Sequence, residues 1–89
     1  MNKYLAEFLG TMLFLYAILA SGNPYAIGIA LTVVILIFGP ISGGHFNPAV
    51  SVMMVYDGAL DSSDLLPYIA AQIGGGIVAL QAFDMINSK

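Results

Sequence analysis

The sequence predicts an all-α membrane protein with three transmembrane helices and one short helix that enters the membrane without crossing it. Hydrophobic residues make up 60% of the 89 positions, charged residues only 8%, and the mean hydropathy is +0.93. This balance excludes an ordinary soluble domain. Three long apolar stretches are present, and a polar, glycine-rich stretch at residues 42–47 lies between the second and the third.

The first apolar stretch is expected to span the membrane over residues 4–21. Gly22, Asn23 and Pro24 follow it, and this turn chemistry ends a helix. Glu7 lies about one turn inside the span, where hydrocarbon strongly disfavours an ionisable group. We therefore expect Glu7 to be paired or functional, with snorkelling of its carboxyl group to the interface as the alternative. Its position also argues against a cleaved signal peptide.

The second span is expected over residues 25–40, which end in a Gly-Pro pair. The third is expected over residues 65–83, with Ser63 or Asp64 as its N-cap. Three crossings would place the N-terminus and the C-terminus on opposite sides of the membrane. Each side then carries one lysine, so the preference of basic residues for the cytoplasmic side gives no orientation. This tie fits a chain that inserts in both orientations.

Residues 42–56 are expected to form a re-entrant loop and a half-helix. Asn47 is a preferred N-cap residue, and Pro48 suits the first helical position. The helix that follows, over residues 49–56, would rise about 12 Å, less than half of a hydrocarbon core of roughly 30 Å. Irregular backbone survives at such a depth only inside protein or along a water-filled cavity. The free carbonyls of the loop would then face the permeating molecule.

The run Ser-Gly-Gly-His-Phe-Asn-Pro-Ala-Val at residues 42–50 resembles the first Asn-Pro-Ala (NPA) loop of the major intrinsic protein family, the aquaporins and aquaglyceroporins. Ala-Glu-Phe-Leu-Gly-Thr at 6–11 and Ala-Gln-Ile-Gly at 71–74 extend the resemblance over nearly the whole chain. The resemblance implies that residues 1–89 form one aquaporin-like repeat, half of an aquaporin fold. It also implies a passive channel for water, with glycerol and other small neutral solutes as further candidates.

The NPA residues Asn47, Pro48 and Ala49 are the first expected pore residues. The Asn47 amide would donate to a passing oxygen, and the start of the half-helix would add about half a positive charge. Simple N-capping by Asn47 is the alternative. The residues whose carbonyls are expected to line the pore precede it directly: Gly43, Gly44, His45 and Phe46. For the two glycines, tight packing is the alternative interpretation.

Two polar residues are expected to support the loop, as the resemblance implies: Glu7 from the first span and Gln72 from the third. The family narrows its pore with an arginine after the second NPA motif, whereas this chain contains no arginine. The expected constriction is therefore an apolar ring of Ile27, Ile35 and Val50, which would gate by wetting.

The chain offers no chemistry for catalysis. It contains no nucleophile paired with a base, no phosphate-binding glycine motif with a lysine, no cysteine and a single histidine, so neither an enzyme, a cofactor nor a metal site is expected. No basic patch favours nucleic acid. The expected partners are the lipid bilayer, water and small neutral solutes.

One repeat would supply half a pore, because inverted repeats build their site at the interface between halves. The leading hypothesis is a homo-oligomer, an inverted dimer or a higher assembly. Pairing with another aquaporin-like chain and a truncated product are the alternatives. The rival function is a non-conducting or regulatory membrane subunit that associates with full-length aquaporins.

Overall fold

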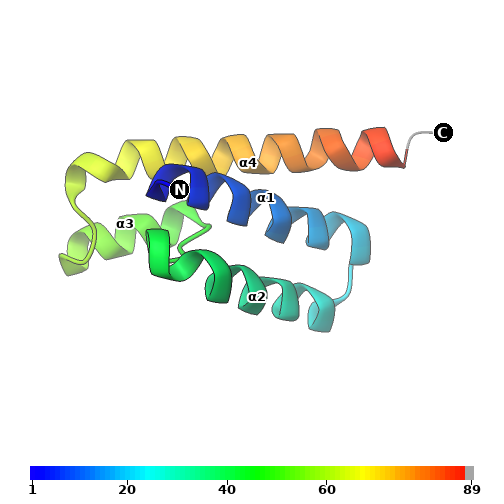
Figure 1. Ribbon diagram of the computed structural model, residues 1–89, viewed down its shortest axis with the longest axis horizontal. Helices are drawn as coiled ribbons and strands as arrows, with labels where there is room; N and C mark the ends of the chain where they lie inside the picture. The colour runs from blue at the N-terminus through cyan, green and yellow to red at the C-terminus, as the bar shows by residue number, and fades with distance from the viewer. Residues whose placement is uncertain (88–89) are drawn as a thin grey trace.

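The computed structural model describes residues 1–87 as helices joined by short connections (Figure 1). Within these residues the α-helices are α1 (Lys3–Ser21), α2 (Pro24–Ser42), α3 (Pro48–Asp57) and α4 (Leu65–Ile86), and a 3-10 turn, η1 (Ser62–Asp64), leads into α4. The segments α1, α2 and η1 with α4 are long and apolar enough to cross a membrane. The predicted all-α fold, with three long apolar helices and one shorter helix, is confirmed.

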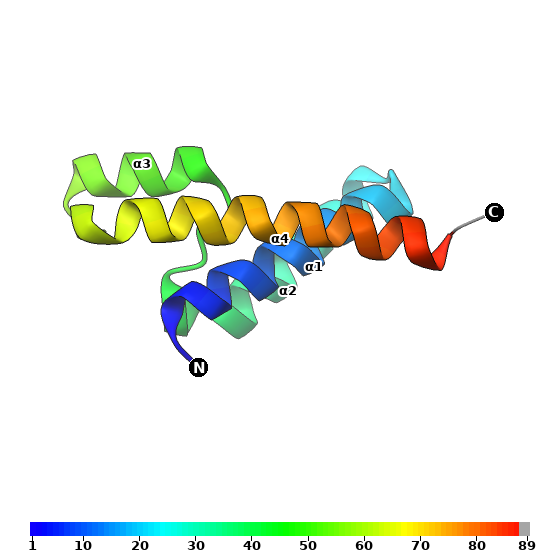
Figure 2. The same ribbon diagram turned by 90° about the horizontal axis from the view of Figure 1, so that it is seen from above.

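The helices alternate in direction as successive crossings would. The start of α1 lies beside the start of α4, because Lys3 Nζ is 2.6 Å from Asp64 Oδ2. The turn between α1 and α2 lies toward the other end of the molecule, as does the end of α4 (Figure 1). Figure 2 shows α3 alongside the first half of α4, with the start of α1 on the opposite side of α4.

The connection after α1 follows the sequence pattern, whereas the end of α2 differs from it. Asn23 Oδ1 accepts from the N–H of Tyr25 at 2.9 Å and caps α2. The expected end of α2 at Pro40 was wrong, since the helix continues to Ser42. Pro40 lies in the last turn, where it has no N–H to donate to the carbonyl of Leu36. The left-handed conformation that ends a helix is instead provided by Gly43, whose N–H donates to the Gly39 carbonyl at 2.8 Å.

The short helix α3 begins at the Asn-Pro signal, and α4 begins differently from expectation. Asp64 makes no N-cap hydrogen bond through its side chain, and Asp61 caps the preceding 3-10 turn. The carboxylate of Asp64 binds Lys3 and Tyr4 of α1 instead. α4 also runs three residues beyond its expected end. Lys89, on which the expected tie in orientation partly depends, lies outside the described residues.

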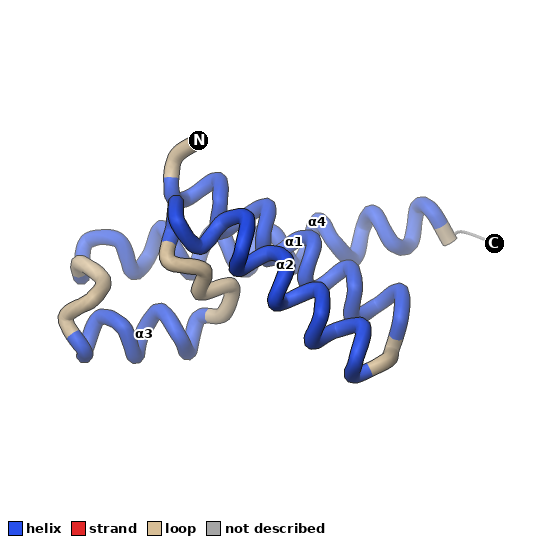
Figure 3. Tube along the Cα trace, turned by 60° about the horizontal axis from the view of Figure 1, so that its bottom comes forward, coloured by secondary structure: helices blue, strands red, loops and turns tan. Residues whose placement is uncertain are grey.

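A small core holds the α2–α3 connection, drawn in tan in Figure 3, against α1 and α2. The Phe46 ring packs on Phe38 with ring centroids 6.4 Å apart. It occupies space that a side chain at Gly10 would need, since a Cβ there would lie 2.1 Å from the ring. Gly75 plays the same part between α1 and α4, where a Cβ would lie 2.6 Å from the Phe8 carbonyl oxygen. Small residues thus set how closely the helices approach the loop.

Candidate functional site

The loop before α3 has an unusual backbone. Gly43 (φ +94°), Gly44 (φ +68°) and Phe46 (φ +54°) all lie in the left-handed region. For Phe46 this conformation costs on the order of 1–3 kcal/mol. Its ring is only 3% exposed, and the apolar area that it buries offsets that cost. The packing of Phe46 therefore helps to impose the loop conformation.

Glu7 is fully buried and holds the loop from α1. Oε1 accepts from the Phe46 N–H and from Gln72 Nε2, both at 2.8 Å. Oε2 accepts from the His45 N–H at 3.1 Å and from the Ser42 hydroxyl at 2.7 Å. These four hydrogen bonds match the acceptor capacity of a carboxylate. Snorkelling of Glu7 to the interface is wrong, because the carboxylate points inward.

A second polar chain ties the loop to the half-helix. Gln72 Nε2 also donates to Ser51 Oγ at 2.9 Å, and Ser51 Oγ lies 2.8 Å from His45 Nδ1. Because Ser51 accepts from Gln72, its hydroxyl proton is available for His45 Nδ1. The direction of the Ser51–His45 hydrogen bond depends on which ring nitrogen of His45 carries the proton. Helix α4 thus braces the loop through α3 as well as through Glu7.

The hydrogen bonds of the loop amides determine where its carbonyls point. The Gly44 N–H donates to Ser42 Oγ at 3.2 Å, and the N–H groups of His45 and Phe46 donate to Glu7. Within residues 1–87 all peptide bonds are trans, so each carbonyl points opposite to the N–H of the next residue. The carbonyls that point away from Ser42 and Glu7 are those of Gly43, Gly44 and His45. Within the described chain none of them accepts a hydrogen bond.

Asn47 lies exposed at the start of α3. Its Oδ1 accepts from the Ala49 N–H at 2.8 Å and so caps the helix. Its amide nitrogen, Nδ2, has no hydrogen-bond partner among residues 1–87. The cap therefore uses only the oxygen of the side chain and leaves the donor available.

A groove of about 490 Å³ opens beside Asn47, between α1 and the second half of α4. Most of its lining is apolar, as with Ile77 and Leu80. Two buried polar atoms belong to residues in this lining, Thr11 Oγ1 and Gln72 Oε1, and neither has a hydrogen-bond partner in the described chain. Both atoms are buried, so the exposed polar side chain of this groove is that of Asn47.

The expected site residues are distributed unevenly around this loop. Glu7 and Gln72 meet at it, and Asn47 borders the groove. Ile35 lies beside the loop, 3.6 Å from where a Cβ on Gly44 would be. The other two expected constriction residues, Ile27 and Val50, are partly buried and, like Ile35, do not line the groove.

Four residues of the site were not predicted: Thr11, Ser42, Ser51 and Tyr68. Ser51 could have been found as a polar residue one turn after Asn47 in an otherwise apolar half-helix. Tyr68 precedes Gln72 by one helical turn and so shares its face of α4. Within residues 1–87, no group of side chains is arranged to hold a metal ion.

Comparison with known proteins identifies the family. The sequence profile of the major intrinsic proteins matches residues 1–89. "Glycerol uptake facilitator protein-like 6" of Lactiplantibacillus plantarum is 47% identical, over 92% of this chain and 42% of its own. "Aquaporin Z" of Brucella melitensis is 40% identical, over 99% of this chain and 45% of its own. "Aquaglyceroporin AqpS" of Rhizobium meliloti is 38% identical, over 85% of this chain and 40% of its own.

The chain thus spans less than half the length of the curated relatives that it matches. The predicted resemblance is confirmed over the whole sequence. Together with three helices long and apolar enough to cross a bilayer, it confirms the predicted integral, multi-pass membrane location. The chain belongs to the major intrinsic protein family.

Proposed function

We propose that the chain supplies one half of a passive transmembrane pore for water and for small neutral solutes such as glycerol. The observation that carries the proposal is the direction of the loop backbone. The N–H groups of Gly44, His45 and Phe46 are held inside the protein, and the preceding carbonyls point away from Ser42 and Glu7 without a partner in the described chain. A row of fixed carbonyl acceptors can replace the hydrogen bonds to other water molecules that a water molecule loses when it enters a pore.

Asn47 complements these acceptors with a donor. Nδ2 is not used by the cap, and the start of α3 adds partial positive charge beside it. A water oxygen would accept from this amide while its hydrogens bind carbonyls of the loop. The same field disfavours cations. The pore therefore conducts neutral molecules without any covalent step.

The groove supports the proposal that a second copy in inverted orientation completes the pore. Lipid chains could cover Ile77 and Leu80, but they cannot accept from the Asn47 amide nitrogen, which borders the groove and has no partner among residues 1–87. A polypeptide or a file of water can satisfy this atom. An inverted copy would bring a second Asn47 loop to the middle of the membrane.

The solute range depends on the apolar candidates Ile27, Ile35 and Val50, which we propose as the narrow ring of the assembled pore. Without arginine, the ring would exclude solutes by size and by wetting. Two of the matched relatives are named for glycerol uptake or as an aquaglyceroporin, which supports testing glycerol beside water.

Stopped-flow light scattering on proteoliposomes tests the proposal with the Asn47→Asp variant. Aspartate caps a helix as well as asparagine does, but it cannot donate from the side chain. This variant therefore separates capping from donation. The control is Asn23→Asp, which changes the cap of α2 outside the loop.

We expect vesicles with the wild-type chain to shrink faster than empty vesicles in a sucrose gradient, and to admit glycerol afterwards. Asn47→Asp should lower water permeability about tenfold, whereas Asn23→Asp should leave it unchanged. Rates equal to those of empty vesicles, from folded and inserted protein, would overturn the proposal. A stable complex with a full-length aquaporin would then favour the regulatory-subunit hypothesis.

A further inference from the structure

We propose that Tyr68 is a positioning residue that fixes where the row of free carbonyls begins. The inference rests on the proposed function, because it concerns the same loop. Tyr68 is only 1% exposed, and its hydroxyl donates to the Ser42 carbonyl oxygen at 2.7 Å. Ser42 is the last residue of α2 and directly precedes the carbonyls proposed to bind water.

The peptide unit between Ser42 and Gly43 is held at both ends. Its N–H, that of Gly43, donates to the Gly39 carbonyl at 2.8 Å, and its carbonyl accepts from Tyr68. The next peptide units are held only at their N–H ends. Tyr68 therefore separates the carbonyl that the protein uses from those that it leaves free.

The Tyr68 ring contacts the loop as well. Its centroid lies 5.2 Å from that of the His45 ring and 6.0 Å from that of Tyr4, which meets it edge-on. His45 belongs to the row of free carbonyls, and Tyr4 belongs to α1. The ring thus joins α4 to the two segments that determine the position of the loop.

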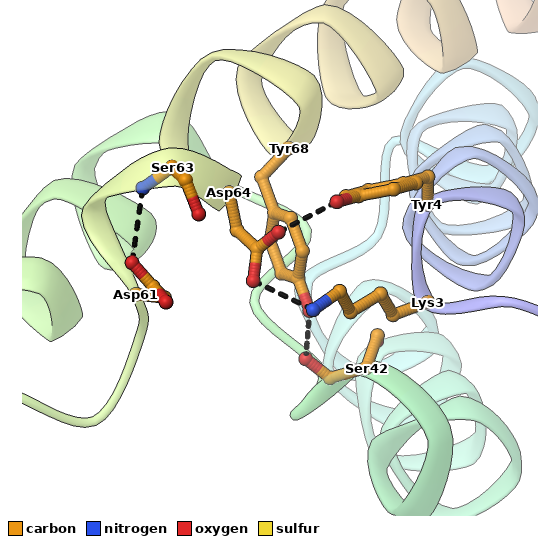
Figure 4. A network of polar contacts seen from close by, with 7 residues as sticks. All are labelled: Lys3, Tyr4, Ser42, Asp61, Ser63, Asp64 and Tyr68. Carbon is orange, nitrogen blue, oxygen red and sulfur yellow. Dashed lines mark hydrogen bonds and ion pairs between the residues drawn. The ribbon is translucent and has the colours of Figure 1, made fainter.

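An ion pair outside the ring holds this arrangement in place. Asp64 Oδ1 accepts from the Tyr4 hydroxyl and Oδ2 from Lys3 Nζ, both at 2.6 Å. Figure 4 shows the Tyr68 side chain running from α4 past Asp64 and Lys3 to Ser42. The cluster Lys3, Tyr4 and Asp64 fastens the starts of α1 and α4, the helices that carry Glu7 and Tyr68.

The first readout is amide hydrogen exchange of the full chain in lipid, which reports the loop whether or not the chain conducts. The variant is Tyr68→Phe, which keeps the ring and removes the hydroxyl. Amides of residues 43–46 should exchange about tenfold faster in this variant than in the wild type. The matched control is Tyr16→Phe, since the Tyr16 ring packs on Phe83 and its hydroxyl has no partner among residues 1–87.

The second readout is conduction. Tyr68→Phe should lower water permeability about threefold and change the ratio of glycerol to water permeability, which a general loss of stability would not do. Asp64→Asn, which leaves the Tyr68 hydroxyl in place, should act in the same direction with a smaller effect. Asp64→Asn also provides the test if Tyr68→Phe does not fold.

The outcomes separate the two proposals. Exchange in the loop that is equal in Tyr68→Phe and Tyr16→Phe would overturn the role of Tyr68. Faster exchange with an unchanged permeability ratio would overturn its role in positioning the carbonyls. A wild-type chain that does not conduct would overturn the proposed function, and the exchange data would still decide whether Tyr68 holds the loop.

Discussion

The two halves of α4 have different surroundings. In the first half, Tyr68 and Gln72 are buried and bind the end of α2, Glu7 and Ser51. In the second half only Ala79 is buried, and large apolar side chains are exposed: Ile77 (54%), Leu80 (48%), Met85 (79%) and Ile86 (70%). Leu66 and Ile73 of the first half are exposed as well, so the two halves differ in the buried polar contacts that only the first half makes.

The difference indicates that the first half of α4 stabilises the single chain, whereas the second half is available for association with another chain. The N–H groups of Gly44, His45 and Phe46 are all bound inside the chain, so the loop conformation needs no second copy. The groove beside the second half is lined mostly by apolar side chains, and Ile77 and Leu80 are about half-exposed. Substitutions in the first region should therefore affect folding of the single chain, and substitutions in the second should affect association.

Glu7→Gln should have the largest effect on the single chain. The glutamine amide would replace one acceptor oxygen by an NH₂ group, which would then face N–H and O–H donors that now bind the carboxylate. The free energy of unfolding should therefore fall by about 3 kcal/mol. Thermal unfolding in detergent measures the loss. Asp84→Asn, an exposed carboxylate in the second half of α4, is the control and should change stability by less than about 0.5 kcal/mol. Similar losses in both variants would contradict the contrast between the two regions.

Gly10→Ala should destabilise the chain by about 1–3 kcal/mol, because its methyl group would overlap the Phe46 ring. Gly28→Ala provides the control, since a Cβ there would meet no side chain and no other segment of the described chain within 4 Å. That substitution should raise stability by about 0.5–1 kcal/mol, from higher helix propensity. The melting temperatures of both variants are measured in the same detergent. A shift of the same sign in Gly10→Ala and Gly28→Ala, relative to the wild type, would contradict tight packing at the loop.

Ser51→Ala should have a moderate effect, a loss of about 1–2 kcal/mol, because Gln72 Nε2 and His45 Nδ1 both lose a partner. The loss should be accompanied by faster amide exchange in the loop. The control is Ser21→Ala, because the Ser21 hydroxyl makes only local contacts: it donates to the Ala17 carbonyl and accepts from the Asn23 N–H. Unchanged exchange in Ser51→Ala would show that α3 does not brace the loop.

Leu80→Ala should have the smallest effect on the single chain, a change of less than about 1 kcal/mol, because the side chain is already half-exposed. We expect it to weaken self-association instead, by about tenfold, as energy transfer between labelled chains in vesicles would report. Unchanged association would contradict the assignment of the groove as the contact between copies.

The sequence predicted the helices well where local chemistry determines them. Asn47 followed by Pro48 identifies the start of α3, and Glu7 could be expected to bind something because an unpaired charge is costly in hydrocarbon. The end of α2 was missed because Pro40 was given more weight than Gly43. A proline in the last turn removes one hydrogen bond, whereas a left-handed glycine ends the helix.

Long-range contacts were the part of the site that the sequence could not provide. Asp64 reads as a helix cap, yet its carboxylate binds Lys3 and Tyr4, about sixty positions earlier in the chain. Thr11 carries no local signal of its role, and Tyr68 has only its place one turn before Gln72. Their positions depend on how α1, α4 and the loop pack together. Close glycine contacts, such as that of Gly75, determine this packing.

A mixing experiment tests most directly that the second region is completed by another copy. Wild-type chains and Asn47→Asp chains are combined in equal amounts before reconstitution, and water permeability is measured by stopped flow. If each pore needs two copies with an intact Asn47, working pores follow the square of the wild-type fraction, about one quarter at equal mixing. We predict that value. A permeability of about one half, expected when each copy conducts alone, would contradict the account.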